Sequence, residues 1–265
     1  MKCHFISCII SKLSSRIRGL AIIFGLVLFS SREACTQITV AVAANVQFAM
    51  EELKFDFKRS SGIEVKTVYG ASGKFCTQIK NGAPFDLFIS ADMDFPDSLF
   101  KWGQTAEKAK VYAYGKLVLW TIKDVNLDSG LHSLTDSAVA KIALADPKRA
   151  PYGRESVKAL ESLGLYKKVL PKLVYGENIS QVTQYILTGN VDIGISAKSV
   201  VLADELRGKG KWKEVDSTLY DKIAQGAVIC KYGRENHPDL SARFFKYLYS
   251  QSARKILSKY GYALP

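Results

Sequence analysis

Short apolar runs alternate with amphipathic segments from residue 38 onward, and this alternation limits the possible folds more than any other feature. The runs ITVAVA (38–43), IEVKTVYG (63–70) and DLFIS (86–90) are rich in β-branched residues or alternate with period two, which predicts strands. A helix-like stretch follows each run, and the first of these ends at Gly62. This β-α-β-α-β order predicts an α/β fold in which helices cover a parallel sheet.

A second unit of the same kind begins near residue 115. Its expected elements are strands in 115–121, 141–147 and 191–196, helices in 152–163, 179–187 and 197–206, a long strand in 222–231, and helices in 238–250 and 251–259. No long linker separates the two units, so we expect two lobes, 36–117 plus 226–265 and 118–225, joined by two crossings. In such sheets ligands bind at the carboxyl ends of strands, against helix N-termini.

The first 34 residues have a different character. Four basic residues precede the apolar run 19–29, which is shorter than the about 20 residues that span a bilayer. A basic segment, a short apolar segment and small residues before Ala34 predict a secretory signal peptide over 1–34, and hence a periplasmic or other extracytoplasmic protein. The alternatives are an uncleaved membrane anchor and lipidation of Cys35, although SREAC lacks the apolar residue expected three positions before such a cysteine.

Basic residues outnumber acidic ones, 37 to 25, for a net charge of +12. Removing residues 1–34 takes away five basic residues and Glu33, which leaves +8. The charges are dispersed and match no nucleic-acid module, so we expect no nucleic-acid partner. Cys76 and Cys230 have no metal-binding spacing, and a disulfide and two buried thiols both remain open. We expect no metal and no cofactor.

The segment VYGASGKFCTQI (68–79) resembles a phosphate loop at the start of a helix. A nucleotide loop needs glycine where this chain has Val68 and a hydroxyl residue where it has Phe75, so two of its fixed positions fail. Gly70 and Gly73 still allow a tight turn with inward-pointing amides. Ser72 is expected at the helix N-cap, where its hydroxyl either faces an anion or only caps its own helix.

Three more strand-to-helix junctions carry N-capping residues or exposed amides. They are 145–157 with Pro151 and Tyr152, 176–180 with Asn178, and 43–50 with Asn45. Two of the four junctions come from each half of the chain. Helix N-termini bind anions, so the sequence predicts one small-anion site between the lobes.

At these segments the sequence resembles the periplasmic molybdate-binding proteins, the substrate-binding component of molybdate ABC transporters. The resemblance covers nearly all of 37–263, and GAPFDLFISAD (82–92) is its most specific part. The segments 144–166 and 244–262 also match. The resemblance implies a type II periplasmic binding protein fold with a ligand cleft between two lobes. It also implies a monomer that captures molybdate or tungstate, delivers it to a membrane permease, and catalyses no reaction.

The resemblance also implies a set of ligands. Ser72 matches a ligand serine of the family, and Tyr152 and Ile179 fall where the backbone N–H binds the anion. Asn45 stands where the family usually has serine, and its amide retains donors. Ala197 replaces a ligand tyrosine of many members, and we hypothesise that the Tyr152 hydroxyl substitutes for it.

Two basic residues near these positions, Lys74 and Arg154, are either surface charges or charges that face the anion. The family has a neutral residue at the position of Lys74, which is either an exposed lysine in the first turn or a charge aimed at the anion. Arg154 is either a surface residue or a second such charge. The departures at Asn45, Lys74 and Ala197 keep open a receptor of the same fold tuned to phosphate, sulfate or a carboxylate. A phosphotransfer enzyme and a surface adhesin or sensor are further alternatives.

Overall fold

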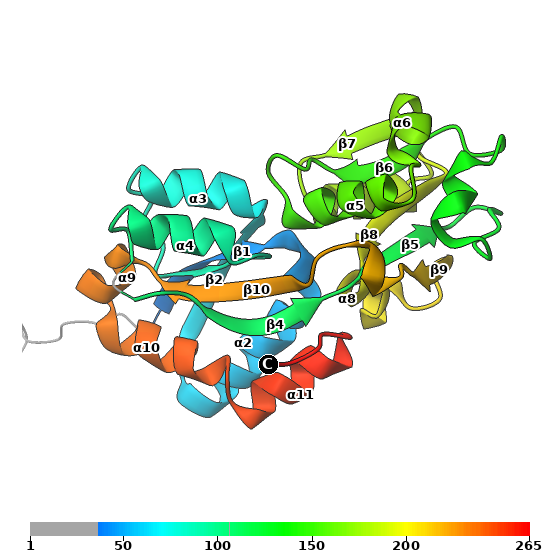
Figure 1. Ribbon diagram of the computed structural model, residues 1–265. Helices are drawn as coiled ribbons and strands as arrows, with labels where there is room; N and C mark the ends of the chain where they lie inside the picture. Colours follow the sequence, from blue (N-terminus) through cyan, green and yellow to red (C-terminus); the bar gives the residue numbers. More distant parts are fainter. Residues whose placement is uncertain (1–36, 106) are drawn as a thin grey trace, which may run out of the picture. The chain divides into compact units, whose positions relative to one another are not determined.

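The alternation of strands and helices produces two five-stranded sheets (Figure 1). The computed structural model describes residues 37–105 and 107–265, so the expected signal peptide and Cys35 lie outside the described residues. The first sheet has the strand order β2-β1-β3-β10-β4 and the second has the order β7-β6-β8-β5-β9.

The first sheet contains strands from both ends of the described chain. Its strands are β1 (Gln37–Ala43), β2 (Glu64–Gly70), β3 (Leu87–Ile89), β4 (Lys110–Gly115) and β10 (Ile223–Ile229). β1 pairs in parallel with β2 and β3, as predicted, but β10 runs antiparallel to β3 and β4. The parallel arrangement expected for the first three strands is therefore confirmed, and the sheet as a whole is mixed because β10 is antiparallel. The reason is that β10 returns directly from the second sheet and enters beside β3 from the opposite end, without a crossover helix.

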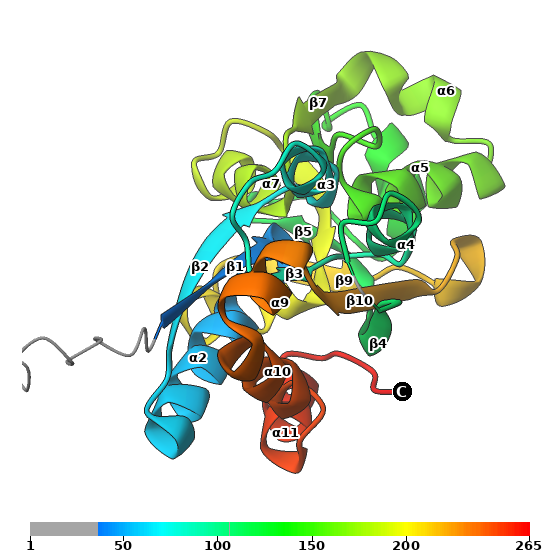
Figure 2. The same ribbon diagram turned by 90° about the vertical axis from the view of Figure 1, so that its left-hand side faces the viewer.

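Helices cover both faces of this sheet (Figures 1 and 2). The helices of this half are α2 (Gln47–Ser61), α3 (Ser72–Lys80), α4 (Asp94–Lys101), α9 (Lys231–Asn236), α10 (Pro238–Tyr247) and α11 (Gln251–Lys259). Side chains of β1 alternate between two cores because successive residues of a strand point to opposite faces. Val40 and Val42 belong to the core with α2, α10 and α11, whereas Ala41 packs with Phe75 of α3 and Leu99 of α4.

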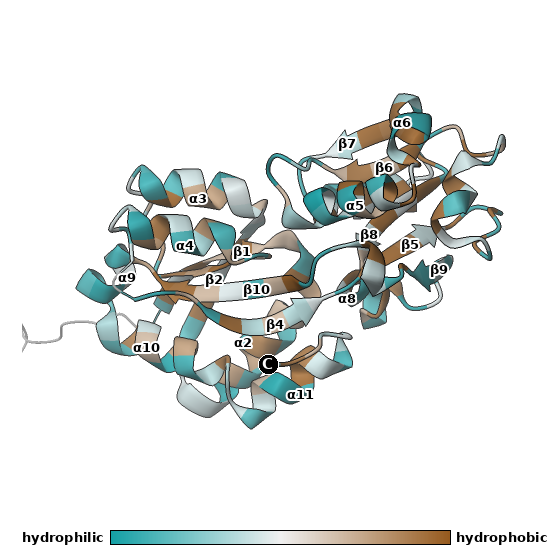
Figure 3. Ribbon diagram, in the orientation of Figure 1, coloured by the Kyte–Doolittle hydropathy of each residue, from teal (hydrophilic) through white to brown (hydrophobic). Residues whose placement is uncertain are grey.

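The second sheet is built in the same way. Its strands are β5 (Leu117–Thr121), β6 (Ile142–Ala145), β7 (Leu173–Gly176), β8 (Ile193–Ala197) and β9 (Lys211–Glu214). Its helices are α5 (Pro151–Ser162), α6 (Tyr166–Val169), α7 (Ile179–Leu187) and α8 (Lys198–Val201). Short 3-10 turns occur in both halves. η1 (Ala44–Val46) connects β1 to α2, and the second half contains η2 (Gly130–Thr135), η3 (Leu170–Lys172), η4 (Asp204–Leu206) and η5 (Ser217–Leu219). In Figure 3 hydrophobic residues concentrate on strands such as β6 and β8.

The chain passes between the two sheets twice. It leaves β4 at Gly115 and enters β5 at Leu117, and it returns through η5 to β10. Both passages lie close to the lobe boundaries expected at 117/118 and 225/226, which stay predictions. Within residues 37–105 and 107–265, no helix combines the length and the apolar character needed to cross a membrane.

Candidate functional site

The starts of four helices meet at one small cavity. η1, which leads into α2, and α3 follow strands of the first sheet, whereas α5 and α7 follow strands of the second. The cavity has about 200 Å³ of space not filled by atoms, part of it open to solvent. It is lined by Ala43, Ala44, Asn45, Gly70, Ala71, Ser72, Ala91, Ala150, Pro151, Tyr152, Asn178 and Ile179. The structure therefore brings together four of the predicted site residues, Asn45, Ser72, Tyr152 and Ile179.

Backbone amides supply most of the hydrogen-bond donors around this cavity. The N–H groups of Asn45, Ser72, Tyr152 and Ile179 make no hydrogen bond to any residue that the structure describes. Such free N–H groups are expected in the first turn of a helix, where the chain offers no carbonyl partner. The positive end of each helix dipole adds to them, so the cavity favours a negative charge.

Ser72 also contributes a side-chain donor. The N-cap of α3 is Ala71, and Ser72 is the first helical residue, so the expected N-cap position of Ser72 is wrong. The Ser72 side chain is buried, and its Oγ accepts a hydrogen bond from the Ala91 N–H at 3.0 Å. Because the oxygen is the acceptor in that bond, the hydroxyl proton remains available for a ligand. Ser72 does not cap its own helix.

Asn45 belongs to a buried set of polar side chains, the Asn45 cluster, made of Asn45, Tyr112, Tyr152, Gln225 and Tyr262. The Asn45 Nδ2 group donates to Gln225 Oε1 at 2.9 Å and to the Tyr262 hydroxyl at 3.1 Å. An amide NH₂ group has two protons, and these two bonds use both. The free donor of Asn45 at the cavity is therefore its backbone N–H and not its side chain.

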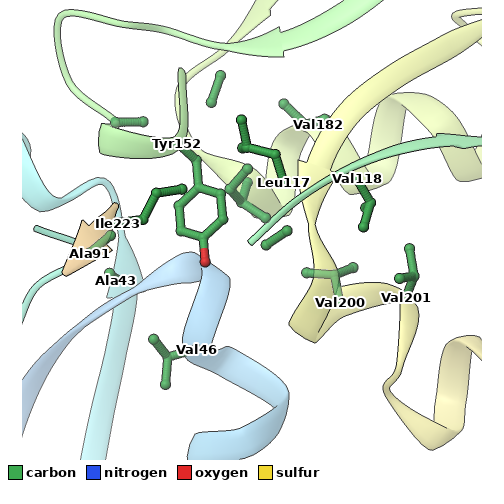
Figure 4. Packing of buried hydrophobic residues seen from close by; sticks show 14 of the residues in the cluster. Ala43, Val46, Ala91, Leu117, Val118, Tyr152, Val182, Val200, Val201 and Ile223 are labelled. Atoms are coloured by element: carbon green, nitrogen blue, oxygen red, sulfur yellow. The ribbon is translucent and has the colours of Figure 1, made fainter. Parts of the chain in front are cut away.

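The Tyr152 side chain reaches from α5 into the same cluster. Figure 4 shows its hydroxyl directed toward the segment that carries Val46. The hydroxyl accepts a hydrogen bond from Gln225 Nε2 at 3.1 Å, and Asn45 Nδ2, whose two protons point to closer acceptors, lies 3.5 Å away. Burial raises the pKa of Tyr152 well above its ordinary value, so the hydroxyl stays protonated. The hypothesis that this hydroxyl substitutes for the missing ligand tyrosine stays a prediction.

Gln225 and Tyr262 were not among the predicted site residues. Gln225 is fully buried in β10, and the Tyr112 hydroxyl donates to its Oε1 at 2.9 Å. The Tyr262 hydroxyl donates to the backbone carbonyl of Asn45 at 3.0 Å. A glutamine within the apolar segment IAQGAVI is a signal that could have identified Gln225, because a buried amide needs polar partners.

The two basic residues near the site are engaged with acidic residues. Lys74 Nζ lies 2.9 Å from Glu177 Oε1. Arg154 Nη2 lies 2.7 Å from Asp92 Oδ2 and 3.2 Å from Asp94 Oδ2. Neither Lys74 nor Arg154 belongs to the cavity lining, which contains no charged side chain among the described residues.

Of the two remaining predicted positions, Ala197 lies outside the cavity lining and Asn178 lies within it. Ala197 ends β8, is fully buried, pairs with Leu117 and is not part of the cavity lining. Asn178 is the N-cap of α7, as predicted, because its side chain accepts a hydrogen bond from the Gln181 N–H at 3.1 Å. Asn178 also lines the cavity, next to Ile179.

The arrangement suits the binding of a small anion without charged ligands. In the part of the chain that the structure describes, no group of three or more His, Cys, Asp or Glu side chains could hold a metal ion. Cys76 and Cys230 are free thiols, so the disulfide alternative is wrong. Both are buried, and burial raises the pKa of the Cys76 thiol to about 11, so it is not a reactive thiolate.

Comparisons with known proteins agree with this architecture. Residues 38–263 match the family model described as bacterial extracellular solute-binding protein. The molybdate-binding protein ModA of Azotobacter vinelandii is 37% identical over 254 residues, which cover 95% of this chain and 100% of that protein. ModA of Rhodobacter capsulatus is 38% identical and covers 92% and 94% of the two chains. The solved structure of the Azotobacter vinelandii periplasmic molybdate-binding protein superposes with a TM-score of 0.82 and 29% identity, covering 86% of this chain and 99% of that one.

Proposed function

Because this chain belongs to the family of bacterial extracellular solute-binding proteins, we propose that it captures molybdate, and its analogue tungstate, outside the cytoplasm. It then delivers the anion to the permease of an ABC transporter. The observation that carries this proposal is the set of free N–H groups at four helix starts around one cavity without charged side chains. The names of the Azotobacter and Rhodobacter relatives favour molybdate among small anions.

The donors match an anion whose oxygens only accept hydrogen bonds. Molybdate is a tetrahedral dianion at neutral pH, and the backbone N–H groups and the Ser72 hydroxyl can each donate to one of its oxygens. Sulfate offers the same acceptors on a smaller tetrahedron. Selectivity between the two must therefore come from the size of the cavity, which is set by the packed alanines around it.

The cavity supports binding and not catalysis. Its lining has no carboxylate and no imidazole among the described residues, so it lacks the usual groups that accept a proton during a reaction. Among the described residues, the two hydroxyl groups, on Ser72 and Tyr152, have no hydrogen bond to a carboxylate or an imidazole. Binding would instead draw the two sheets together around the anion, and the permease would dock the closed form of a monomer.

Calorimetry on the purified chain tests this proposal. The mature chain, stripped of ligand, is titrated with molybdate, tungstate, sulfate and phosphate. We expect strong heat with molybdate and tungstate and little with sulfate or phosphate. Tight binding of phosphate or sulfate without molybdate binding would contradict the proposal and favour a receptor tuned to another anion.

A further inference from the structure

We propose that two ion pairs, Lys74–Glu177 and Arg154–Asp92, form a latch that holds the two lobes closed over the anion without touching it. This inference rests on the proposed function, because it assigns these four residues to the retention of the bound oxyanion. Lys74 and Arg154 are then positioning residues, neither ligands nor idle surface charges.

The first pair joins two of the helix starts at the cavity. Lys74 follows Ser72 by two residues in α3, which packs on the first sheet, and Glu177 precedes Ile179 by two residues at the start of α7, which packs on the second. Their charged atoms lie 2.9 Å apart. Beside them the Gly73 N–H donates to the Arg149 carbonyl at 3.0 Å, so the two lobes are also in backbone contact there.

The second pair joins the start of α5 to the segment between β3 (Leu87–Ile89) and α4. Arg154 follows Tyr152 by two residues in α5, and Asp92 is adjacent to Ala91, which lines the cavity. The Asp92 carboxylate is held in place by Ser90 Oγ at 3.0 Å and by the Phe95 N–H at 3.3 Å. Arg154 Nη2 approaches it to 2.7 Å from the other lobe.

Each pair joins residues from different lobes, so we expect both pairs to break when the lobes separate and their attraction to favour the closed form. A contact made in one of two conformations shifts the equilibrium toward that conformation. When the closed form is more populated, the apparent affinity of the protein for the anion is higher, although the contacts with the anion are unchanged. The latch should therefore change the affinities for molybdate and tungstate by the same factor.

The two pairs should differ in strength. The Lys74 and Glu177 side chains are 51% and 35% exposed, so water and salt screen their attraction. We expect Lys74→Met to weaken anion binding about 2- to 5-fold at low salt. The Asp92 side chain is only 10% exposed, so losing Arg154 leaves a carboxylate that is poorly hydrated in the closed form. We expect Arg154→Met to weaken binding about 10-fold or more.

The experiment measures molybdate and tungstate affinities by calorimetry at low and at high salt. The variants are Lys74→Met, Arg154→Met and the charge-swapped pair Lys74→Glu with Glu177→Lys. The control is Lys66→Met, which removes an exposed lysine that has no ion pair among the described residues. We expect equal losses for both anions and no change in the control. The loss in Lys74→Met should shrink at high salt and be recovered in the charge-swapped pair, whereas the loss in Arg154→Met should depend less on salt.

Other outcomes would overturn the latch. If Lys74 touched the anion, the charge-swapped pair would bind worse than Lys74→Met, because it places a carboxylate at that position. If Lys74 and Arg154 were ordinary surface charges, their variants would match Lys66→Met. A failure of the proposed function is distinguishable, because it appears in the parent chain as an absence of molybdate and tungstate binding. In that case the affinities are measured with sulfate or phosphate, whichever the parent chain binds. The latch is then tested by the same ratio of variant affinity to parent affinity.

Discussion

The Tyr152 hydroxyl accepts a hydrogen bond from Gln225 Nε2 at 3.1 Å, and this bond ties the first turn of α5 to the last strand of the first sheet. α5 packs on the second sheet, and its start lines the anion cavity. The bond therefore links the ligand site to β10, the strand on which the chain returns from the second sheet to the first.

Ser72→Ala should weaken molybdate binding by about 1.5–3 kcal/mol, because the variant removes a hydrogen bond to a charged ligand. Calorimetry measures this loss. Ser60→Ala is the matched control, since Ser60 is an exposed serine that hydrogen-bonds a carbonyl of its own helix. Equal affinities of the two variants would show that Ser72 is not a ligand.

Tyr152→Phe should lower the free energy of unfolding by about 1–3 kcal/mol, because the buried Nε2 group of Gln225 loses an acceptor. Urea denaturation without ligand measures this change. The backbone N–H of residue 152 is retained, so affinity should fall less than in Ser72→Ala. A large loss of affinity with unchanged stability would instead support the hypothesis that the Tyr152 hydroxyl binds the anion.

Gly115→Ala should destabilise the chain by about 1–3 kcal/mol, because a Cβ at this position would lie 2.0 Å from the Tyr152 hydroxyl oxygen and 2.6 Å from Gln225 Nε2. Thermal unfolding measures the effect. In a Tyr152→Phe background the nearest clash is removed, so the cost of Gly115→Ala should be smaller there. Equal costs in both backgrounds would contradict this explanation.

We expect the free energy of unfolding to fall in acid, in part because the Glu214 carboxylate becomes protonated. Burial alone would raise the pKa of this carboxyl, but hydrogen bonds and charge from Lys116 and Lys198 outweigh burial and hold it below its ordinary value. A lowered pKa in the folded state gives stability that is present above the unfolded pKa, about 4.3, and is lost as pH falls through the folded pKa. We therefore expect Glu214→Gln to flatten the loss of stability below about pH 4.3, measured by urea denaturation across pH. Asp239→Asn, in the first turn of α10, is the control for a general charge effect.

Local sequence patterns were enough to predict most strands and helices, because the β-branched runs and N-capping residues act within a few positions. The expected helix 251–259 coincides with α11, and Asn178 caps α7 as expected. The direction of β10 was not predictable in this way, because an apolar run carries no mark of which neighbour it pairs with. The elements that were not expected include β4, β7 and the short helices α6 and α9.

The candidate site was predicted better in its backbone donors than in its side chains. A helix start exposes its N–H groups whatever the residue, so the four junctions predicted one shared site, and the resemblance to the family assigned Tyr152 and Ile179 to it. These residues lie around one cavity, and their contact with the anion stays a prediction. The partners of side chains depend on distant segments. Glu177 beside Lys74, Asp92 beside Arg154 and Gln225 beside Tyr152 are each far from their partners along the chain. No local pattern near Lys74 distinguishes a ligand from a member of an ion pair.

The Asn45 cluster has a consequence for the biosynthesis of the protein. Asn45 lies near the start of the described chain, but Gln225 and Tyr262, which receive its amide protons, follow the entire second sheet in sequence. A nascent chain that still lacks Tyr262 has the four helix starts but leaves the buried amide of Asn45 without one of its acceptors. The hydrogen-bond network behind the cavity is therefore complete only after synthesis has passed Tyr262.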